Sequence, residues 1–370
     1  MADKFWVGGG SSGNWNATAN TNWALTSGGA NNAAVPAGND NVFFDGVGAS
    51  AQDPCTLTAN TANLRSLDFN GYTGTFTHNA SVNIVLQPGN VTVTVRFSSG
   101  MTYTLGSATT SVINMPSGGG ASPTINLTTN GKTLGNVNIC NSGTGTVTVV
   151  LQDALTLGAT STLAVATGTT KAVLNLNNQN ASVGLLTSAG TGVRTITLGL
   201  GTLTLTGTGT VWDTSTTTNL TMTATAGTIK LTGANATFAG GGIAVNNIYF
   251  NNASTNTITG ANTFADLKAD AGGSLVFPAS TTTTVTSLTW DGTAGNLITI
   301  TSSLAGTAAT ISDAAGTNSV TYCSIKDSTA TGGATFNADA NSPNVSGNTG
   351  WNFAGAGGGF GSLALLGVGM

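Results

Sequence analysis

The sequence predicts an all-β fold, a single-stranded parallel β-helix (β-solenoid) with a Trp-rich N-terminal cap and a Gly-rich apolar C-terminal tail. The first observation is alternation: within residues 193–259, apolar and hydroxyl residues alternate, as in Leu203/Leu205 and Ile229/Leu231. Period two is typical of strands with one buried face. The second is spacing, since strand-like segments begin every seven to eleven residues or so, which leaves no room for helices.

Composition is the third observation. Only 6% of the 370 residues are charged, and all 13 acidic residues are Asp. A chain without Glu and with few Lys lacks the usual helix formers. Its β-branched residues allow it to bury apolar surface, which argues against disorder. The 53 glycines follow no strict period of three, which excludes collagen.

Charge and hydropathy exclude several partners. The net charge is −4 and no Lys/Arg cluster occurs, so we expect no nucleic-acid partner. The only continuous apolar stretch, residues 362–370, is too short to span a membrane. The N-terminus has no apolar core of a secretory signal. The cysteines Cys55, Cys140 and Cys323 lie far apart and are expected to be buried as small hydrophobic residues.

Residues 1–50 differ from the rest because they hold half of the six Trp, namely Trp6, Trp15 and Trp23. Tryptophans among Gly and Asn predict a compact aromatic cap over the open end of a β-stack, which needs covering. The alternative is a carbohydrate platform, on which sugars stack against exposed rings.

Residues 51–353 are predicted to form the parallel β-helix body. Segments such as Ser66–Asn70, Asn136–Cys140, Asn247–Asn251 and Ser287–Asp291 carry two apolar residues two positions apart, and we interpret them as equivalent wall positions of successive coils. About 22–30 residues per coil would give roughly eleven to fourteen coils and a rod of about 50–70 Å. An antiparallel meander is the alternative, because Asn70–Gly71, Asn130–Gly131 and Asp291–Gly292 are hairpin-type dipeptides.

Two C-terminal segments carry a resemblance. Residues 290–303 contain GNLITITSS, and residues 322–353 contain YCSIKDSTATGG followed by GNTGWNF. Together with the Trp-rich start, they resemble the ends of β-helical virion proteins of tailed phages (tail fibre, spike or capsid-appendage type) and of β-helical bacterial surface proteins. The resemblance implies architecture and a virion or surface setting, and it implies no reaction.

Residues 354–370 are predicted to form a Gly-rich flexible apolar tail. Its apolar side chains need burial, so we expect the tail to dock on sister chains or on another virion protein. The residues expected to dock are Phe360, Leu363, Leu365, Leu366 and Val368.

Catalysis is not expected. A glycosidase needs two facing carboxyl groups. The Asp pairs that could meet are Asp40 with Asp45, Asp266 with Asp270, Asp291 with Asp313, and Asp313 with Asp327. Arg194 and Asp213 lie about one coil apart and could meet as in a lyase. Strand corners explain such Asp residues more simply. The single His, His78, is predicted to be a turn or surface residue, and no cofactor or metal motif occurs.

These features favour a non-enzymatic structural protein of a phage virion that is made in the host cytoplasm and presents a rod to the host surface. A homotrimer of side-by-side rods is expected, with other virion proteins and host surface polysaccharide as further partners. The alternatives are a polysaccharide-degrading tailspike and a bacterial surface adhesin.

Overall fold

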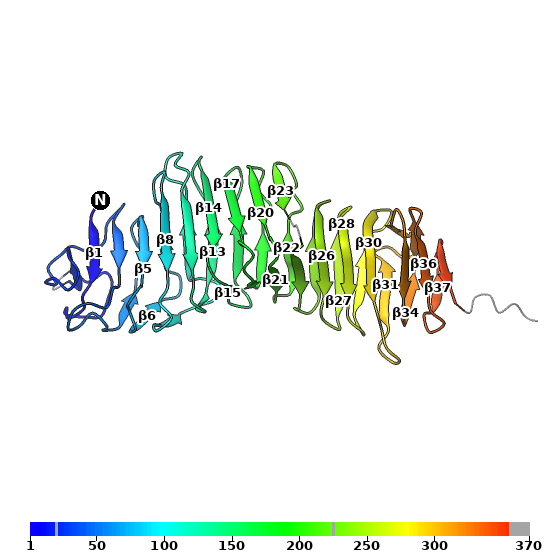
Figure 1. The fold of residues 1–370 in the computed structure, drawn as a ribbon, viewed down its shortest axis with the longest axis horizontal. Coiled ribbons are helices and arrows are strands. Elements are labelled where there is room, and N and C mark those ends of the chain that lie inside the picture. The colour runs from blue at the N-terminus through cyan, green and yellow to red at the C-terminus, as the bar shows by residue number, and fades with distance from the viewer. Residues whose placement is uncertain (19–20, 224–225, 355–370) are drawn as a thin grey trace, which may run out of the picture.

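The chain forms an elongated rod of parallel strands (Figure 1). The computed structural model describes residues 1–18, 21–223 and 226–354. Within these residues there are 38 strands and no helix. All paired strands run parallel except β1 and β2. The predicted parallel β-helix is therefore confirmed, and the antiparallel meander is excluded.

Three walls run along the rod, and the chain visits them in turn. The first wall contains β2 (Trp23–Ala24), β1 (Asp3–Trp6), β3 (Asn41–Phe43), β5 (Ser66–Asp68), β8 (Thr92–Arg96), β11 (Thr124–Thr128), β14 (Thr146–Leu151), β17 (Lys171–Asn175), β20 (Arg194–Thr197) and β23 (Leu220–Thr223). The second wall contains β7 (Asn83–Val85), β10 (Val112–Met115), β13 (Asn136–Ile139), β16 (Thr162–Val165), β19 (Leu185–Thr187), β22 (Gly209–Asp213), β25 (Ala236–Ala239), β27 (Thr255–Thr259), β29 (Ser274–Phe277), β31 (Ile298–Ser302), β34 (Cys323–Lys326) and β37 (Asn344–Ser346).

The third wall contains β12 (Thr133–Leu134), β15 (Leu155–Leu157), β18 (Ala181–Val183), β21 (Thr202–Leu205), β24 (Thr228–Leu231), β26 (Ala244–Phe250), β28 (Thr263–Ala269), β30 (Thr282–Trp290), β32 (Ala309–Ser312) and β35 (Ser328–Thr331). Two short sheets complete the ends: β4 (Cys55–Leu57), β6 (Thr75–His78) and β9 (Thr102–Leu105), and then β33 (Thr317–Val320), β36 (Thr335–Ala338) and β38 (Trp351–Phe353).

Coil length changes along the rod. Thr202 lies beside Thr228, 26 residues later, whereas Thr228 lies beside Asn247 after only 19 residues. The shorter coils fall below the predicted range because β26, β28 and β30 are long strands that run without a separate corner. The second half of β26 pairs with β24, and β26, β28 and β30 pair with one another along both halves, as Ala244 does with Thr263. The third wall then continues from the first residues of β30, where Thr282 pairs with Thr310 of β32.

The four segments predicted to be equivalent are only partly so. Ser66–Asn70 starts with a strand of the first wall, and Asn136–Cys140 contains a strand of the second wall. Asn247–Asn251 and Ser287–Asp291 do share the third wall. Apolar residues two positions apart identify a strand with a buried face, but every wall of the coil carries that same pattern.

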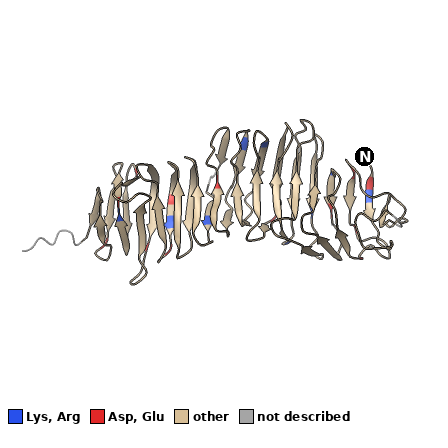
Figure 2. Cartoon of the chain, turned by 180° about the vertical axis from the view of Figure 1, so that it is seen from behind, with Lys and Arg blue, Asp and Glu red and all other residues tan. Residues whose placement is uncertain are grey.

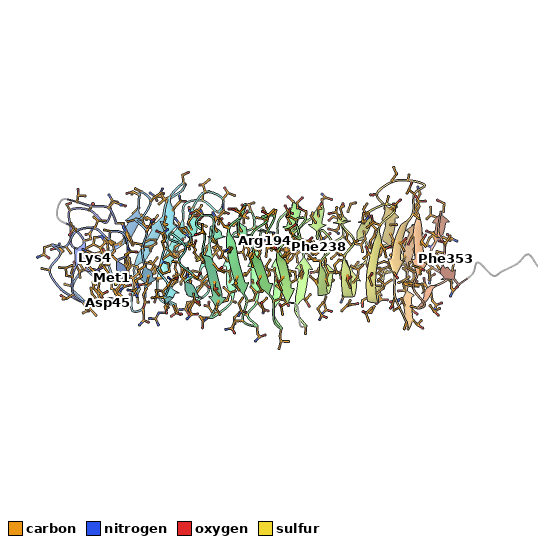
Figure 3. The ribbon with its side chains drawn as sticks, turned by 90° about the horizontal axis from the view of Figure 1, so that it is seen from above. Met1, Lys4, Asp45, Arg194, Phe238 and Phe353 are labelled. Atoms are coloured by element: carbon orange, nitrogen blue, oxygen red, sulfur yellow. The ribbon has the colours of Figure 1, made fainter. Side chains whose placement is uncertain are left out.

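Apolar side chains at alternate positions fill the interior. Leu203, Leu205, Ile229 and Leu231 are fully buried, as their period-two pattern predicts. Aromatic rings stack between coils, as Trp212 does on Phe238 at 5.5 Å between centroids. Cys55, Cys140 and Cys323 are buried free thiols, which confirms their predicted role. Figure 3 shows how densely side chains cover the rod.

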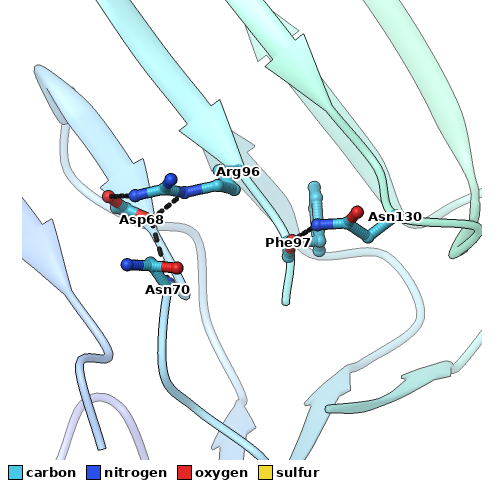
Figure 4. A network of polar contacts seen from close by, with 5 residues as sticks. All are labelled: Asp68, Asn70, Arg96, Phe97 and Asn130. Atoms are coloured by element: carbon cyan, nitrogen blue, oxygen red, sulfur yellow. Dashed lines mark hydrogen bonds and ion pairs between the residues drawn. The ribbon is translucent and has the colours of Figure 1, made fainter. Parts of the chain in front are cut away.

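Asparagine makes many of the corners. Asn130, Asn177 and Asn219 have positive φ, a conformation that Asn tolerates better than most residues. Each side-chain amide donates to a carbonyl of the preceding coil: Asn130 to Phe97 (2.7 Å, Figure 4), Asn177 to Leu151 (3.1 Å) and Asn219 to Thr191 (2.9 Å). The Asn130–Gly131 dipeptide is thus a corner between two walls and not a hairpin.

The parallel ladder begins inside the segment expected to be a cap. Asp3 of β1 pairs with Asn41 of β3, which pairs with Ser66 of β5. Beyond β1 lies β2, which is antiparallel and covers the outer edge of the sheet. The first rungs of the helix therefore lie within residues 1–50, and only β2 with its loops closes the end. Of the predicted tail, residues 355–370 lie outside the described residues.

Candidate functional site

Charged side chains are sparse on the rod (Figure 2). Among the described residues there is one ion pair, between Arg96 and Asp68 (2.6 Å, Figure 4). It joins neighbouring strands of the first wall, and Asp68 also accepts the backbone N–H of Asn70 (2.9 Å). This ion pair is partly exposed and links two coils.

The tryptophans do not form a carbohydrate platform. Trp6, Trp15 and Trp23 are at most 1% exposed, so no ring face is open to a sugar. They pack on one another and on Phe44, with centroid distances from 4.8 to 5.8 Å. The indole N–H of Trp23 donates to the carbonyl of Trp15 (3.0 Å). The aromatic residues fill the interior of the first coils, because this is where apolar surface would otherwise meet solvent.

Several of the acidic residues considered as carboxyl pairs are engaged in local structure. Asp40 is buried and accepts the backbone N–H groups of Ala2 (2.8 Å) and Ala37 (3.0 Å). Asp45 accepts the N–H of Val47 (3.1 Å). These bonds are typical of carboxylates that stabilise turns.

The acids near the C-terminal end serve the same purpose. Buried Asp313 accepts the amide of Asn318 (2.7 Å), and Asp327 accepts the backbone N–H of Gly306 (3.0 Å). Asp291 accepts the hydroxyl of Thr321 (3.2 Å). A glycosidase would need a carboxyl pair that faces a substrate, and these interactions do not supply one.

Arg194 does not meet Asp213. Arg194 lies on the first wall and Asp213 on the second. The guanidinium is fully buried, and burial lowers its pKa. It donates to the carbonyls of Thr216 (2.9 Å), Thr218 (2.6 Å), Gly192 (3.1 Å) and Ser188. Arg194 (labelled in Figure 3) therefore has a structural role, because it supplies hydrogen-bond donors to buried backbone carbonyls.

His78 is not the turn or surface residue that the sequence suggests. It ends strand β6 and is fully buried. Its Nε2 lies 2.9 Å from the carbonyl of Val82, so Nε2 must carry the proton, and Nδ1 then accepts the hydroxyl of Tyr103 (2.7 Å). Burial lowers the pKa of this imidazole, which keeps it neutral.

A group of charged, polar and aromatic side chains lies instead on the outer face of the third wall. Lys230, Tyr249 and Lys268 occupy one row on the consecutive strands β24, β26 and β28. The Lys230 ammonium lies 5.3 Å from the Tyr249 ring centroid, and the Lys268 ammonium lies 4.6 Å from it. We call this row, together with Asp266 and Asp270, the lysine–tyrosine row.

Carboxylates complete the row. Asp270 accepts the Tyr249 hydroxyl (2.5 Å) and the amide of Asn251. Burial and then the bond to Asp270 raise the pKa of Tyr249 to about 12. Asp266 accepts the hydroxyls of Ser287 (2.7 Å) and Thr289 (3.0 Å) through Oδ1. Asp266 and Asp270 were considered above as a possible carboxyl pair. Asp266 lies in strand β28 and Asp270 directly follows it, with Lys268 between them.

The sequence alone does not predict this row, because the row depends on which strands pair and in which register they pair. The alternation places Lys230 and Lys268 on outward positions, but only the 19-residue coils bring both beside Tyr249. A shallow hollow of about 360 Å³ adjoins the row, lined by residues of β15, β18 and β21 and by Lys230.

Two further findings describe the surface. Within residues 1–18, 21–223 and 226–354, no three His, Cys, Asp or Glu side chains are grouped so that they could hold a metal ion. Across the same part of the chain, no helix is long and apolar enough to cross a membrane.

Comparison with protein-family models, with curated proteins and with solved structures finds no match to this chain.

Proposed function

We propose that this chain is a non-enzymatic structural protein of a phage virion: a tail fibre, spike or capsid-attached appendage that presents a β-helical rod for contact with the host surface. The main support for this proposal is the elongated parallel β-helix. Parallel coils run from β1 to the last strands, while the acids weighed above as possible catalytic pairs are bonded within the fold. Such a body is suited to holding surfaces at a distance.

The outer face of the first wall supports side-by-side assembly. One row along this wall is uncharged and consists of small polar and β-branched side chains from consecutive coils: Thr94, Asn126, Val150, Asn175, Thr197 and Thr223. An uncharged row of this kind lets identical chains pack closely, since no buried charge has to be neutralised. A closed homotrimer satisfies such a face on every copy.

The experiment is to locate the protein on particles. An antiserum raised against purified protein is applied with immunogold labelling to particles released when the source cells lyse. The proposal predicts label on projections of the particle, with serum preadsorbed on the protein as the control. Particles without label, together with protein found only in the soluble lysate, would contradict a virion role.

A further inference from the structure

The lysine–tyrosine row is unusual in a chain with so few charges. The chain of 370 residues has only nine Lys and Arg and thirteen Asp. Four of these charged residues nevertheless lie close together on one wall, namely Lys230, Asp266, Lys268 and Asp270. Neither Lys forms an ion pair with the described residues, and their interactions are those with the Tyr249 ring. The two partly buried Lys side chains therefore keep N–H donors available.

The ring of Tyr249 sets how these groups are presented. Lys230 comes from the coil before it and Lys268 from the coil after it, and both ammonium groups lie over the ring. The two lysines lie two coil rises apart, about 9.6 Å along the axis. The ring acts as a spacer between two donors, and its faces are occupied.

Acceptors lie beside the donors. Asp266 Oδ1 is bonded to two hydroxyls, while no partner within the described residues occupies its Oδ2. The two Asp balance the two Lys, so the patch has no net formal charge. A strongly anionic ligand would face two carboxylates, and a cationic ligand would face two ammonium groups.

Hydroxyl groups fit this arrangement best. An ammonium group only donates hydrogen bonds and an ionised carboxylate only accepts them, whereas an alcohol does both. Neighbouring hydroxyls of one sugar can accept from Lys268 and donate to Asp266 at the same time. The chemistry of the patch therefore matches an uncharged, polyhydroxylated ligand.

The row continues along the rod in line with the hollow. The outward positions that precede Lys230 are Thr204, Ser182 and Thr156, each on the next coil toward the N-terminus. All three line the hollow of about 360 Å³. From Thr156 to Lys268 the row covers five coil rises, about 24 Å. We call this line of outward side chains, which runs from Thr156 to Lys268 with one polar side chain per coil, the lane.

We propose that this lane binds an uncharged linear oligosaccharide that lies along the rod axis, with its hydroxyls bonded to Lys230, Lys268 and Asp266. This inference rests on the proposed function, because the glycan would belong to the host surface that the rod contacts. It deepens that function by assigning the contact to one face of one wall.

The test uses the purified full chain and isothermal titration with three neutral hexasaccharides: cellohexaose, maltohexaose and hexa-N-acetylchitohexaose. Hexagalacturonate is the anionic comparator. The variants are Lys268→Ala and the nearly isosteric Asp266→Asn, and the control is Lys171→Ala on an exposed position of the first wall. Thermal unfolding of each variant shows that it is folded.

The proposal predicts that at least one neutral hexasaccharide binds the natural chain and the control equally, and that each lane variant binds it about tenfold more weakly, the effect of losing a hydrogen bond to a charged group. No binding of any neutral hexasaccharide would overturn it. So would binding that both lane variants leave unchanged, or binding of hexagalacturonate alone that disappears at high salt.

Failure here is distinguishable from failure of the virion role. Glycan binding is measured on the isolated rod, whereas the immunogold experiment asks where the protein resides. Binding with unlabelled particles would retain the lane and remove the virion role. Labelled particles without binding would retain the virion role and remove the lane.

Discussion

At the scale of single residues, the polar groups inside the rod carry the clearest consequences. His78 is buried and neutral, with Val82 and Tyr103 as hydrogen-bond partners. Because burial lowers its pKa, the unfolded chain takes up a proton below about pH 6.5 more readily than the folded chain does. The free energy of unfolding is therefore expected to fall as the pH drops below about 6.5.

Urea unfolding at pH 7.5 and 5.5 measures this effect. The natural chain should lose stability between the two values. His78→Gln should lose less, because Gln keeps an amide that can donate and accept but does not titrate, and most Asp side chains titrate at lower pH. An equal loss in both proteins would show that His78 is not responsible.

Arg194 gives a second prediction at this scale. Replacing it with Met leaves four backbone carbonyls without their donors, among them those of Thr216 and Thr218. Unsatisfied buried acceptors are costly, so Arg194→Met should lower the free energy of unfolding by about 2–4 kcal/mol. The matched control is Lys171→Met on the neighbouring strand β17, which should change it by less than about 0.5 kcal/mol. Similar losses in both variants would contradict the structural role.

At the scale of elements, corners decide how closely the coils stack. Gly184, Gly207 and Gly233 follow one another at the same corner of successive coils. A Cβ on Gly207 would lie 2.7 Å from the carbonyl oxygen of Gly184, and one on Gly233 would overlap that of Gly207. Backbone atoms cannot move aside without separating the coils.

Gly233→Ala is therefore expected to lower the free energy of unfolding by about 2 kcal/mol or more, because it strains a backbone contact. Gly38→Ala is the control, since a Cβ there meets nothing within 4 Å. Thermal and urea unfolding of both variants measure the difference. If Gly233→Ala were as stable as the control, the close contact between corners would not limit coil stacking.

The apolar tail lies outside the described residues, and its predicted docking role leads to a separate test. We propose that Phe360, Leu363, Leu365, Leu366 and Val368 dock on a sister chain or on another virion protein. A chain ending at residue 354 should then bind particles less well or change its oligomeric state, as measured by co-sedimentation and light scattering. Unchanged behaviour in both measurements would leave the tail without a docking role.

Strands were the most predictable elements. The pattern predicts strand starts every seven to eleven residues within 193–259, and β20 to β28 begin at residues 194, 202, 209, 220, 228, 236, 244, 255 and 263. Period two shows which side chains face inward, but it carries no information on which wall a strand joins. The wall depends on the turn of every corner before it, which is why Leu67 and Val137 lie on different walls.

At the scale of the whole molecule, the lysine–tyrosine row shows why the site was harder to predict than the fold. Lys230 and Lys268 are 38 positions apart and share no motif, and they meet at Tyr249 only because two successive coils have 19 residues each. The position of His78 was misjudged for a related reason. Its burial depends on neighbours from other coils, and local sequence does not reveal those neighbours.

We propose that identical rods of this kind pack side by side to form a fibre or spike. Size-exclusion chromatography with light scattering, combined with small-angle X-ray scattering, measures the mass and shape of the particle in solution. A trimer of side-by-side rods has three times the 36.4 kDa chain mass and the scattering of an elongated rod. A monomer at all concentrations, or a compact particle of any mass, would contradict it.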